Sequence, residues 1–323
     1  MSSESQAKPT VKTRVCMISD THTATPFPAG ALNKAYRYPL PKSDIFLHAG
    51  DLTRTGRQAE HEVIVDMLRR DVDAELKLVI AGNHDLTHDK EYYARKGLMR
   101  HGSARLEDPD ANRALYTDES ARNAGIVYME EEVRTFSLKN GARFTVYASP
   151  YTPEFFGWAF AYERDEDRFN PSTPMSSRNV KTWVPSFPDV DIMLTHGPPL
   201  GFLDDVGGMR KGVGCESLLK ACERARPRLH VFGHIHEGFG AVRHNWSNDN
   251  DNDNDSDAGE ISLDFDTALE QRCYSYDMSS DAKKPLKFGE ETLFVNASVV
   301  TVRYHANNAP WVVDLDLPLA TSQ

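Results

Sequence analysis

The sequence contains few cysteines, no long apolar run and no excess of positive charge. No apolar run approaches the roughly 18 residues that a bilayer-spanning helix needs, and the first ten residues lack an apolar signal core. No Cys-x-x-Cys spacing occurs, which argues against a disulfide framework or a cysteine-ligated zinc site. The four cysteines are Cys16, Cys215, Cys222 and Cys273. These absences predict a soluble, cytoplasmic protein without a membrane partner.

Acidic residues outnumber basic ones. The 323 residues include 48 Asp and Glu against 37 Lys and Arg, for a formal net charge of −11. Such a chain gains no general electrostatic affinity for a nucleic-acid polymer, so we expect no such partner. A phosphate-bearing substrate would have to be attracted locally, by metal ions or by a few cations. The 40% hydrophobic content is ample for a large core.

Short apolar runs that end in polar clusters recur along the chain. Helical spacing at 56–70 and 216–226 separates some of them, and this alternation predicts βαβ units with a largely parallel sheet. Ligand sites in such sheets lie beyond the carboxyl ends of the strands, where these polar clusters fall. The runs cover residues 15–19, 45–47, 76–81, 190–194 and 229–232.

Further strands and the domain limits follow from turn signals and composition. Asn140-Gly141 is a hairpin signal between two of the remaining apolar segments. We predict a disordered lead-in at 1–12 and a single domain at 13–318, with an acidic insertion at 243–290 that contains the low-complexity tract 247–257. The remaining predicted strands cover 126–129, 133–138, 144–148, 293–295 and 311–315.

The polar clusters contain side chains that bind metals. Asp20 and His22 form one i, i+2 pair and His234 and His236 another, and such pairs project from one face of an extended segment. Mixed His, Asp and Asn donors suit Mn²⁺, Zn²⁺ or Fe rather than Mg²⁺ or Ca²⁺. The full set is Asp20, His22, Asp51, Asn83, His84, His196, His234 and His236.

In this order the clusters resemble the five motif blocks of the calcineurin-like metallophosphoesterase superfamily, over roughly residues 13–316. The blocks are Asp20-Thr21-His22, Gly50-Asp51, Gly82-Asn83-His84-Asp85, His196 and Gly233-His234-Ile235-His236. The stretches 18–22, 48–51, 79–84, 195–201, 230–238 and 295–298 are more closely similar to the metallophosphoesterase-domain-containing proteins. In one branch of that subgroup Gly stands at the position of His236. This chain keeps the histidine, so its set of ligands is intact.

The resemblance implies a four-layer α/β/β/α sandwich of two mixed sheets, with a dimetal site at the sheet edge. The cofactors would be two divalent transition-metal ions, Mn²⁺ first, with Fe or Zn²⁺ as alternatives. His84 would stabilise the transferring phosphoryl group and protonate the leaving oxygen, and Asp85 would orient it. Asp20, His22, Asp51 and His236 would hold the first metal, and Asp51, Asn83, His196 and His234 the second.

The same resemblance implies a phosphodiesterase acting on small phosphodiesters, cyclic nucleotides first. Its nucleophile would be a hydroxide shared by the two metals. Two alternatives stay open: a dimetal hydrolase acting on a non-phosphate bond, and a weakly active metal-binding scaffold. A protein serine/threonine phosphatase is disfavoured, because Leu52-Thr53-Arg54 follows Asp51 where those enzymes are expected to have Asp-Arg-Gly. The sequence carries no signal for an oligomeric state.

Aromatic residues between the third and fourth motif blocks are candidates for substrate contacts. Phe155, Phe156 and Trp158 could stack a nucleobase, and packing of their loop onto the core is the alternative. Two further histidines, His88 and His101, are expected at the surface.

Overall fold

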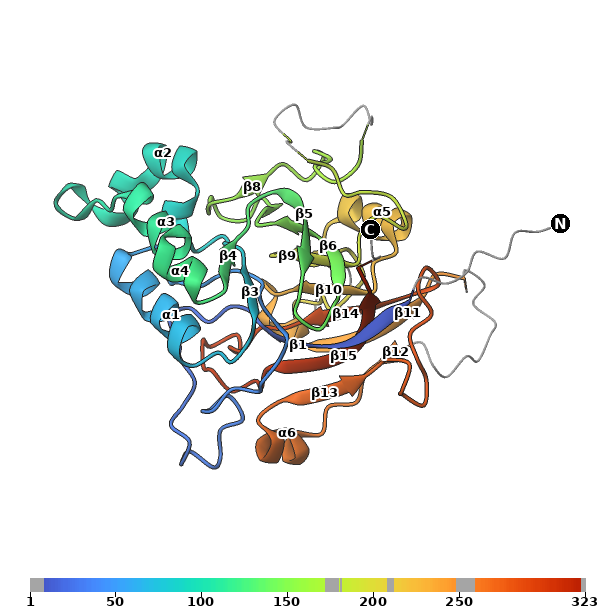
Figure 1. Cartoon of the computed structure of the whole chain (residues 1–323). Helices are drawn as coiled ribbons and strands as arrows, with labels where there is room; N and C mark the ends of the chain where they lie inside the picture. Colours follow the sequence, from blue (N-terminus) through green and yellow to red (C-terminus); the bar gives the residue numbers. More distant parts are fainter. Residues whose placement is uncertain (1–8, 172–179, 181, 208–211, 248–258, 321–323) are drawn as a thin grey trace.

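The computed structural model describes residues 9–171, 180, 182–207, 212–247 and 259–320 (Figure 1). Two sheets form its centre. The first has the strand order β13-β15-β1-β2-β3-β4, and the second has the order β12-β11-β14-β10-β9-β6-β5. The strands of the first sheet are β1 (Thr10–Ile18), β2 (Ile45–His48), β3 (Leu76–Val79), β4 (Ile126–Tyr128), β13 (Tyr274–Asp277) and β15 (Trp311–Pro318). The strands of the second are β5 (Glu132–Ser137), β6 (Arg143–Ser149), β9 (Ile192–Thr195), β10 (Leu229–Phe232), β11 (Gly240–Asn245), β12 (Gly259–Glu260) and β14 (Glu291–Asn296).

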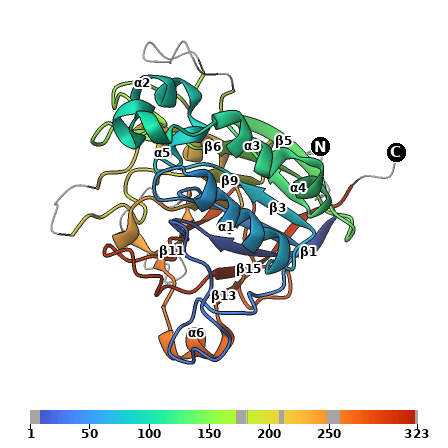
Figure 2. The same cartoon turned by 90° about the vertical axis from the view of Figure 1, so that its left-hand side faces the viewer.

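Helices cover the outer face of each sheet. Figure 1 shows α1–α4 on one side of the sheets and α5 on the other. Their bounds are α1 (Gln58–Arg70), α2 (Lys90–His101), α3 (Pro109–Thr117), α4 (Glu119–Asn123) and α5 (Glu216–Ala225). A short helix, α6 (Phe265–Gln271), lies beside the 23–43 loop, and Ala268 packs there on Ala35 (Figure 2). The predicted α/β/β/α sandwich of two mixed sheets is confirmed.

Alternating side chains divide the core into layers. Val15 and Met17 of β1 point between the sheets, while Cys16 and Ile18 point outward toward the α1 side. Both faces of β1 are therefore buried, which explains why the segment reads as a continuous apolar run. A third cluster packs α5 on the outer face of the second sheet. Among the described residues, no helix combines the length and apolarity that crossing a bilayer requires.

Parallel pairing brings the ligand-bearing strand ends to one edge. β1 pairs with β2, and β2 with β3, in parallel, and β10 pairs with β9 in parallel in the other sheet. The loops that follow these strands carry the predicted ligands. Parallel strands share the direction of their carboxyl ends, so ligands from both sheets can meet at one edge.

Two predicted boundaries are wrong. β1 starts at Thr10, so residues 10–12 belong to the first sheet rather than to the predicted lead-in; residues 1–8 lie outside the described part. The predicted insertion at 243–290 is also partly folded. It includes the end of β11, which pairs with β14, and β13, which pairs with β15. The low-complexity tract falls largely on residues 248–258, outside the described part.

Candidate metal centre

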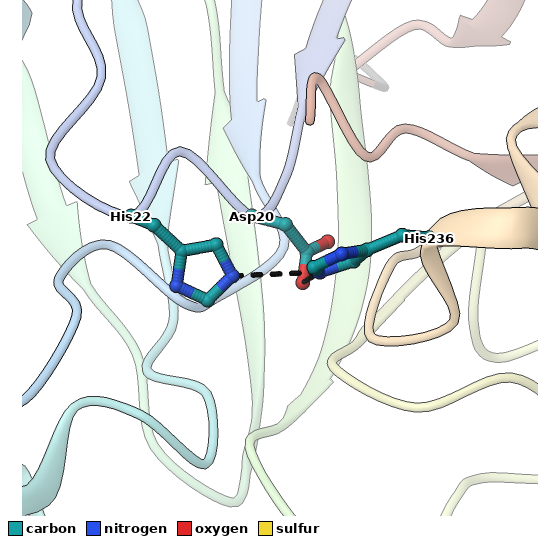
Figure 3. Close-up of side chains that lie close together, drawn as sticks. All are labelled: Asp20, His22 and His236. Atoms are coloured by element: carbon teal, nitrogen blue, oxygen red, sulfur yellow. Dashed lines mark hydrogen bonds and ion pairs between the residues drawn. The ribbon is translucent and has the colours of Figure 1, made fainter. Parts of the chain in front are cut away.

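Loops from both sheets bring the predicted ligands together at this edge. Figure 3 shows Asp20, His22 and His236 converging, with the two imidazoles turned toward one another. The ligand atoms of these three residues lie within 4.8 Å of one another, as do those of Asp20, Asp51 and His196. Segments more than 200 residues apart in sequence thus meet at one place.

Two histidines are oriented by backbone carbonyls. His22 donates from Nδ1 to the Thr53 carbonyl at 3.2 Å, and His196 donates from Nδ1 to the Ala49 carbonyl at 2.8 Å. Each Nε2 is then left with a lone pair directed into the site. A hydrogen bond at Nδ1 is the usual way in which a protein fixes the tautomer of a metal-binding imidazole.

The Asp51 carboxylate lies between these two histidines. Its Oδ2 is 3.6 Å from Nε2 of His22, and its Oδ1 is 3.4 Å from Nε2 of His196. Oδ1 also accepts the backbone N–H of His84 at 2.8 Å, which fixes the carboxylate. One carboxylate therefore presents its two oxygens to two separate groups of donors, as a metal bridge would.

The remaining ligands complete the two groups. Oδ1 of Asp20 lies 3.4 Å from Nε2 of His236, and the Asp20 carboxylate accepts the backbone N–H of His234 at 3.1 Å. Oδ1 of Asn83 lies 3.0 Å from Nε2 of His196. The His234 ring centroid is 5.1 Å from that of His196. Each predicted ligand is thus found at this edge of the sheets.

The donor set fits divalent cations. Nε2 of His196 is a lone-pair donor that faces the oxygens of Asn83 and Asp51, and Nε2 of His22 faces Nε2 of His236. Two acceptor atoms that direct lone pairs at each other repel unless a proton or a metal ion lies between them. Buried nitrogen and oxygen donors in this mixture suit transition metals.

The electrostatics also favour positive charge here. Burial would lower the pKa of His196, but the neighbouring Asp51 and Asp20 carboxylates raise it to about 9. Burial, opposed by Asp51, lowers the pKa of His22 to about 4, and burial with the nearby His196 lowers that of His234 to about 3. His22 and His234 are therefore neutral imidazoles, whereas the carboxylates beside His196 favour a positive charge there, which a proton or a bound metal ion would supply.

Four of the predicted ligands adopt a strained backbone conformation. Asp20, His22, Asp51 and His234 all have left-handed φ angles, of 52°, 44°, 52° and 67°. Non-glycine residues rarely adopt this conformation, and such residues gather at functional sites. Close approach also requires Gly233, where an added Cβ would lie 2.0 Å from Oδ2 of Asp20.

His84 lies beside the ligands with a different orientation. Its Nδ1 donates to the Arg54 carbonyl at 2.8 Å, which leaves Nε2 as the ring nitrogen available to the adjoining cavity. The prediction that Asp85 orients His84 is wrong. Asp85 instead accepts hydrogen bonds from the backbone N–H groups of Leu52, Thr53 and Gly82 and from the Thr53 hydroxyl, at 2.6–3.1 Å. Burial and the Asp51 charge raise the pKa of Asp85 to about 7.

A cavity of about 440 Å³ opens over the centre. Phe155 and Trp158 line it, as predicted for a substrate wall, but Phe156 does not; this side chain is 80% exposed and lines a neighbouring surface recess. Trp158 stacks on His84 rather than offering a free face. Apolar side chains dominate the cavity lining, and Arg164 and Glu237 are the charged residues found there in addition to Asp51 and the histidines, among the described residues.

Two residues of the site were not predicted. Tyr304 lines the cavity, and its ring centroid lies 4.7 Å from that of His22 and 5.2 Å from that of His236. Asn296, in a stretch already singled out by resemblance, donates from Nδ2 to the Ile235 carbonyl at 2.8 Å and so supports the loop between His234 and His236. The left-handed φ of Tyr304, 59°, is visible only in the structure.

The other histidines have structural surroundings. His88 and His101 were expected at the surface, but they are 4% and 7% exposed. His101 contacts the Tyr93 hydroxyl at 2.7 Å and the Thr55 carbonyl at 2.9 Å. The surface prediction for both is therefore wrong.

Comparison with known proteins agrees with this geometry. A family profile described as calcineurin-like phosphoesterase matches residues 13–238. The chain belongs to this family. A calcineurin-like phosphoesterase is a metal-dependent hydrolase of phosphoesters, and the clustered ligands support a divalent dimetal centre.

Several known proteins resemble this phosphoesterase. Metallophosphoesterase domain-containing protein 1 of Homo sapiens is 30% identical over 315 residues, which cover 96% of this chain and 73% of the human protein. A probable rhamnogalacturonate lyase C of Emericella nidulans is 33% identical over 229 residues, which are 70% of this chain but only 17% of that protein. The crystal structure of a phosphopantetheinyl hydrolase from Mycobacterium tuberculosis aligns with a TM-score of 0.36 at 16% identity, over 82% of this chain and 93% of that one.

Proposed function

We propose that the protein is a dimetal phosphodiesterase that hydrolyses small phosphodiesters, with cyclic nucleotides as the first candidates and Mn²⁺ as the first candidate metal. The observation that carries the proposal is the position of Asp51. Its two oxygens face His22 and His196, which lie in the two halves of the ligand set. A carboxylate that serves two metals is the central feature of a dimetal hydrolytic site.

Seven residues would hold the two ions. Asp20, His22 and His236 would hold the first and Asn83, His196 and His234 the second, with Asp51 shared by both. When bound, two divalent ions would activate water for attack on phosphorus and neutralise the negative charge of the phosphoryl oxygens. Asn83 is a neutral ligand, so the site keeps more positive charge than a further carboxylate would allow.

His84 is suited to deliver a proton to the leaving oxygen. Its Nδ1 is occupied by the Arg54 carbonyl, so the proton for the leaving group would come from Nε2. The ring is half-buried at the cavity wall, and its ligand atom lies within 4.8 Å of those of His22 and Asp51, so it is close to where the metals and the phosphoryl group would lie. Imidazole groups titrate near neutral pH, which suits general-acid catalysis.

The cavity lining favours a diester with a small organic group. Its volume of about 440 Å³ is in the range of small-molecule sites. The Arg164 guanidinium is offset by the Glu237 carboxylate in this lining. A phosphodiester carries a single negative charge, whereas a monoester approaches two, so a site with little cationic lining beyond its metals favours the diester. Phe155 and Tyr304, which are 53% and 45% exposed, offer apolar surface to the rest of the molecule.

A reducing, cytoplasmic location is part of the proposal. The four cysteines are buried free thiols in the structure. Thiols of this kind are usual in cytosolic proteins.

Turnover assays test the proposal. The Mn²⁺-loaded protein should hydrolyse bis-p-nitrophenyl phosphate and at least one 2′,3′- or 3′,5′-cyclic nucleotide. His84→Ala should reduce the rate by about 10²- to 10⁴-fold on the cyclic substrate, the usual value of a general acid. Asp51→Asn should abolish metal-dependent turnover, while Asp73→Asn, at an exposed carboxylate paired with Lys42, should not. No metal-dependent hydrolysis of any of these substrates by the loaded wild type would refute the proposal.

Metal analysis distinguishes an enzyme from a scaffold. Two equivalents of Mn²⁺ per chain are expected after loading. Less than about one equivalent would favour the scaffold alternative, because a bridged pair of ions needs both halves of the ligand set to be filled.

A further inference from the structure

The His84 ring is covered by an indole that is itself held by a guanidinium. The ring centroids of His84 and Trp158 lie 4.0 Å apart, with 25° between their planes. The Arg100 guanidinium carbon lies 4.3 Å from the Trp158 ring centroid. Arg100 belongs to the last turn of α2, so a helix outside the ligand loops is connected to His84 through Trp158.

Arg100 is fixed in place by two hydrogen bonds. Its Nε donates to the Tyr92 hydroxyl at 2.8 Å, and its Nη2 donates to the Gly157 carbonyl at 2.8 Å. The Tyr92 hydroxyl donates to the same carbonyl at 2.9 Å. Gly157, which precedes Trp158, is thus held by two turns of α2, one carrying Tyr92 and the other carrying Arg100. A guanidinium held in this way can stay over the indole, where it gains a cation–π attraction.

The residues after Trp158 are tied to the other end of α2. Asp89 caps this helix by accepting the Tyr92 N–H on Oδ1, and its Oδ2 accepts the Phe160 N–H, both at 2.9 Å. The chain around Trp158 is therefore anchored on both sides to one helix. This arrangement gives the indole a fixed plane against which the His84 ring packs.

The other ring contacts of His84 are edge contacts, with His22 at 4.7 Å and Tyr304 at 6.3 Å between centroids, so Trp158 provides the stacked face. The His84 side chain donates a hydrogen bond from Nδ1 to the carbonyl of Arg54, an exposed residue. A single hydrogen bond at Nδ1 allows the ring to tilt about that contact. Packing against the indole removes this freedom, and restricting a side chain before reaction is how a protein keeps a catalytic group aligned.

We propose that Trp158 and Arg100 are positioning residues for His84: Trp158 restricts the imidazole so that Nε2 stays directed at the leaving oxygen, and Arg100 restricts Trp158. This inference rests on the proposed role of His84 as general acid. It also assigns Trp158 a different role from that of a platform for a nucleobase, because His84 and Arg100 already occupy its ring.

Leaving-group dependence separates positioning from simple packing. Protonation by His84 matters for an alkoxide leaving group, as in a 3′,5′-cyclic nucleotide, and much less for p-nitrophenolate, which departs without a proton. Trp158→Ala should therefore lower kcat on the cyclic nucleotide by about 10- to 100-fold, and by about threefold or less on bis-p-nitrophenyl phosphate. KM and metal content should stay close to the wild-type values. A fall of equal size on both substrates, or a change confined to KM, would overturn the inference.

Arg100 offers a matched pair of variants. Arg100→Gln should lower kcat on the cyclic substrate in the same selective way but less strongly, and Arg100→Lys should restore part of the rate because it keeps a cation near the indole. Arg95→Gln, at an exposed arginine on the same helix whose Nε donates to the Glu91 carbonyl, is the control. If Arg100→Gln behaves like Arg95→Gln, Arg100 has no positioning role.

A double-mutant cycle distinguishes failure of this inference from failure of the proposed function. In a His84→Ala background, Trp158→Ala should cost nothing further on the cyclic substrate, because its effect acts through His84. A further loss equal to that in the wild-type background overturns the inference alone. If Trp158→Ala does not fold, Trp158→Phe gives the same comparison with a smaller expected loss. An inactive wild type would instead contradict the proposed function.

Discussion

His22 and His236 direct their Nε2 atoms at each other across 3.4 Å. Nδ1 of His22 already donates to the Thr53 carbonyl, so its Nε2 offers a lone pair rather than a proton. Two nitrogens at this distance, beside the Asp20 carboxylate, are arranged around a position for a cation rather than for a direct bond (Figure 3). This pair explains why His236 is the sharpest single test of the ligand assignment.

Replacing His236 with Gly should weaken the first metal site while leaving the second. The variant should bind about one Mn²⁺ tightly and need about 10- to 100-fold more Mn²⁺ for half-maximal activity, the range expected when a ligand sphere is damaged. Isothermal titration and the Mn²⁺ dependence of turnover measure this. His305→Ala, at an exposed histidine in the neighbouring loop, should keep the wild-type Mn²⁺ dependence. Two unchanged Mn²⁺ sites in His236→Gly would show that His236 is not a ligand.

Replacing Asp85 with Asn should destabilise the protein and the centre together. The carboxylate accepts four hydrogen bonds, and an amide would turn an NH₂ group toward donors. We expect a loss of about 1–3 kcal/mol in unfolding free energy for the unsatisfied buried groups. Urea denaturation of the metal-free protein measures it. Wild-type stability would mean that the loops after β2 and β3 are held by other contacts.

Replacing Tyr304 with Gly separates the contribution of the aromatic ring to activity from the contribution of the strained backbone to stability. The left-handed φ of 59° is costly for tyrosine but free for glycine, so the folded protein should be as stable as the wild type or more stable. Activity should nevertheless fall, by about tenfold in kcat/KM, because the ring that contacts His22 and His236 is lost. Thermal unfolding and turnover are compared on the same preparation. An active, stable Gly variant would remove Tyr304 from the functional site.

Acid should destabilise the metal-free protein partly through a buried histidine behind the site. Burial lowers the pKa of His61 from 6.5 to about 3. The unfolded chain therefore binds a proton that the folded chain does not, and stability is lost as pH falls from about 6.5 toward 3. The contribution is up to about 1.4 kcal/mol per pH unit. His61→Gln should lose stability less steeply than wild type in this window, by urea denaturation at several pH values. Parallel plots of unfolding free energy against pH for His61→Gln and the wild type would contradict this prediction.

Strands that carry ligands were predictable because both of their faces are buried. β10 has the predicted limits, Leu229–Phe232, and the metal-capable residues follow directly. A continuous apolar run that stops at polar residues needs no tertiary information to be recognised. The ligands were found because each follows such a run.

Other strands were missed because their buried residues are polar. β11 contains Arg243, which is 3% exposed and pairs with Glu291 of β14 at 2.6 Å. Charged residues that form a buried ion pair between strands resemble surface residues in the sequence, so composition alone places residues 243–245 in an insertion. α2 was missed for the opposite reason: Leu98 and Met99 are 61% and 67% exposed, which obscures the helical periodicity.

The unpredicted site residues depend on tertiary contacts. Tyr304 lies in a loop closed by the bridge between Val300 and Ala306, and nothing in its neighbours specifies a strand or a helix. Its approach to His22 is set by how β14 and β15 are placed. The stacking of Trp158 on His84 likewise depends on the anchoring of its loop to α2. Such contacts join segments that are far apart in the sequence, and the periodicity of each segment alone does not reveal them.

The most direct measurement is the rate of hydrolysis of a 3′,5′-cyclic nucleotide and of bis-p-nitrophenyl phosphate by the metal-free protein as Mn²⁺ is added. We predict no turnover without metal, activity that rises as two Mn²⁺ bind per chain, and loss of that activity in Asp51→Asn, whose amide replaces the carboxylate facing both His22 and His196. A fully Mn²⁺-loaded wild type that hydrolyses neither substrate, or an Asp51→Asn variant as active as wild type, would contradict the account.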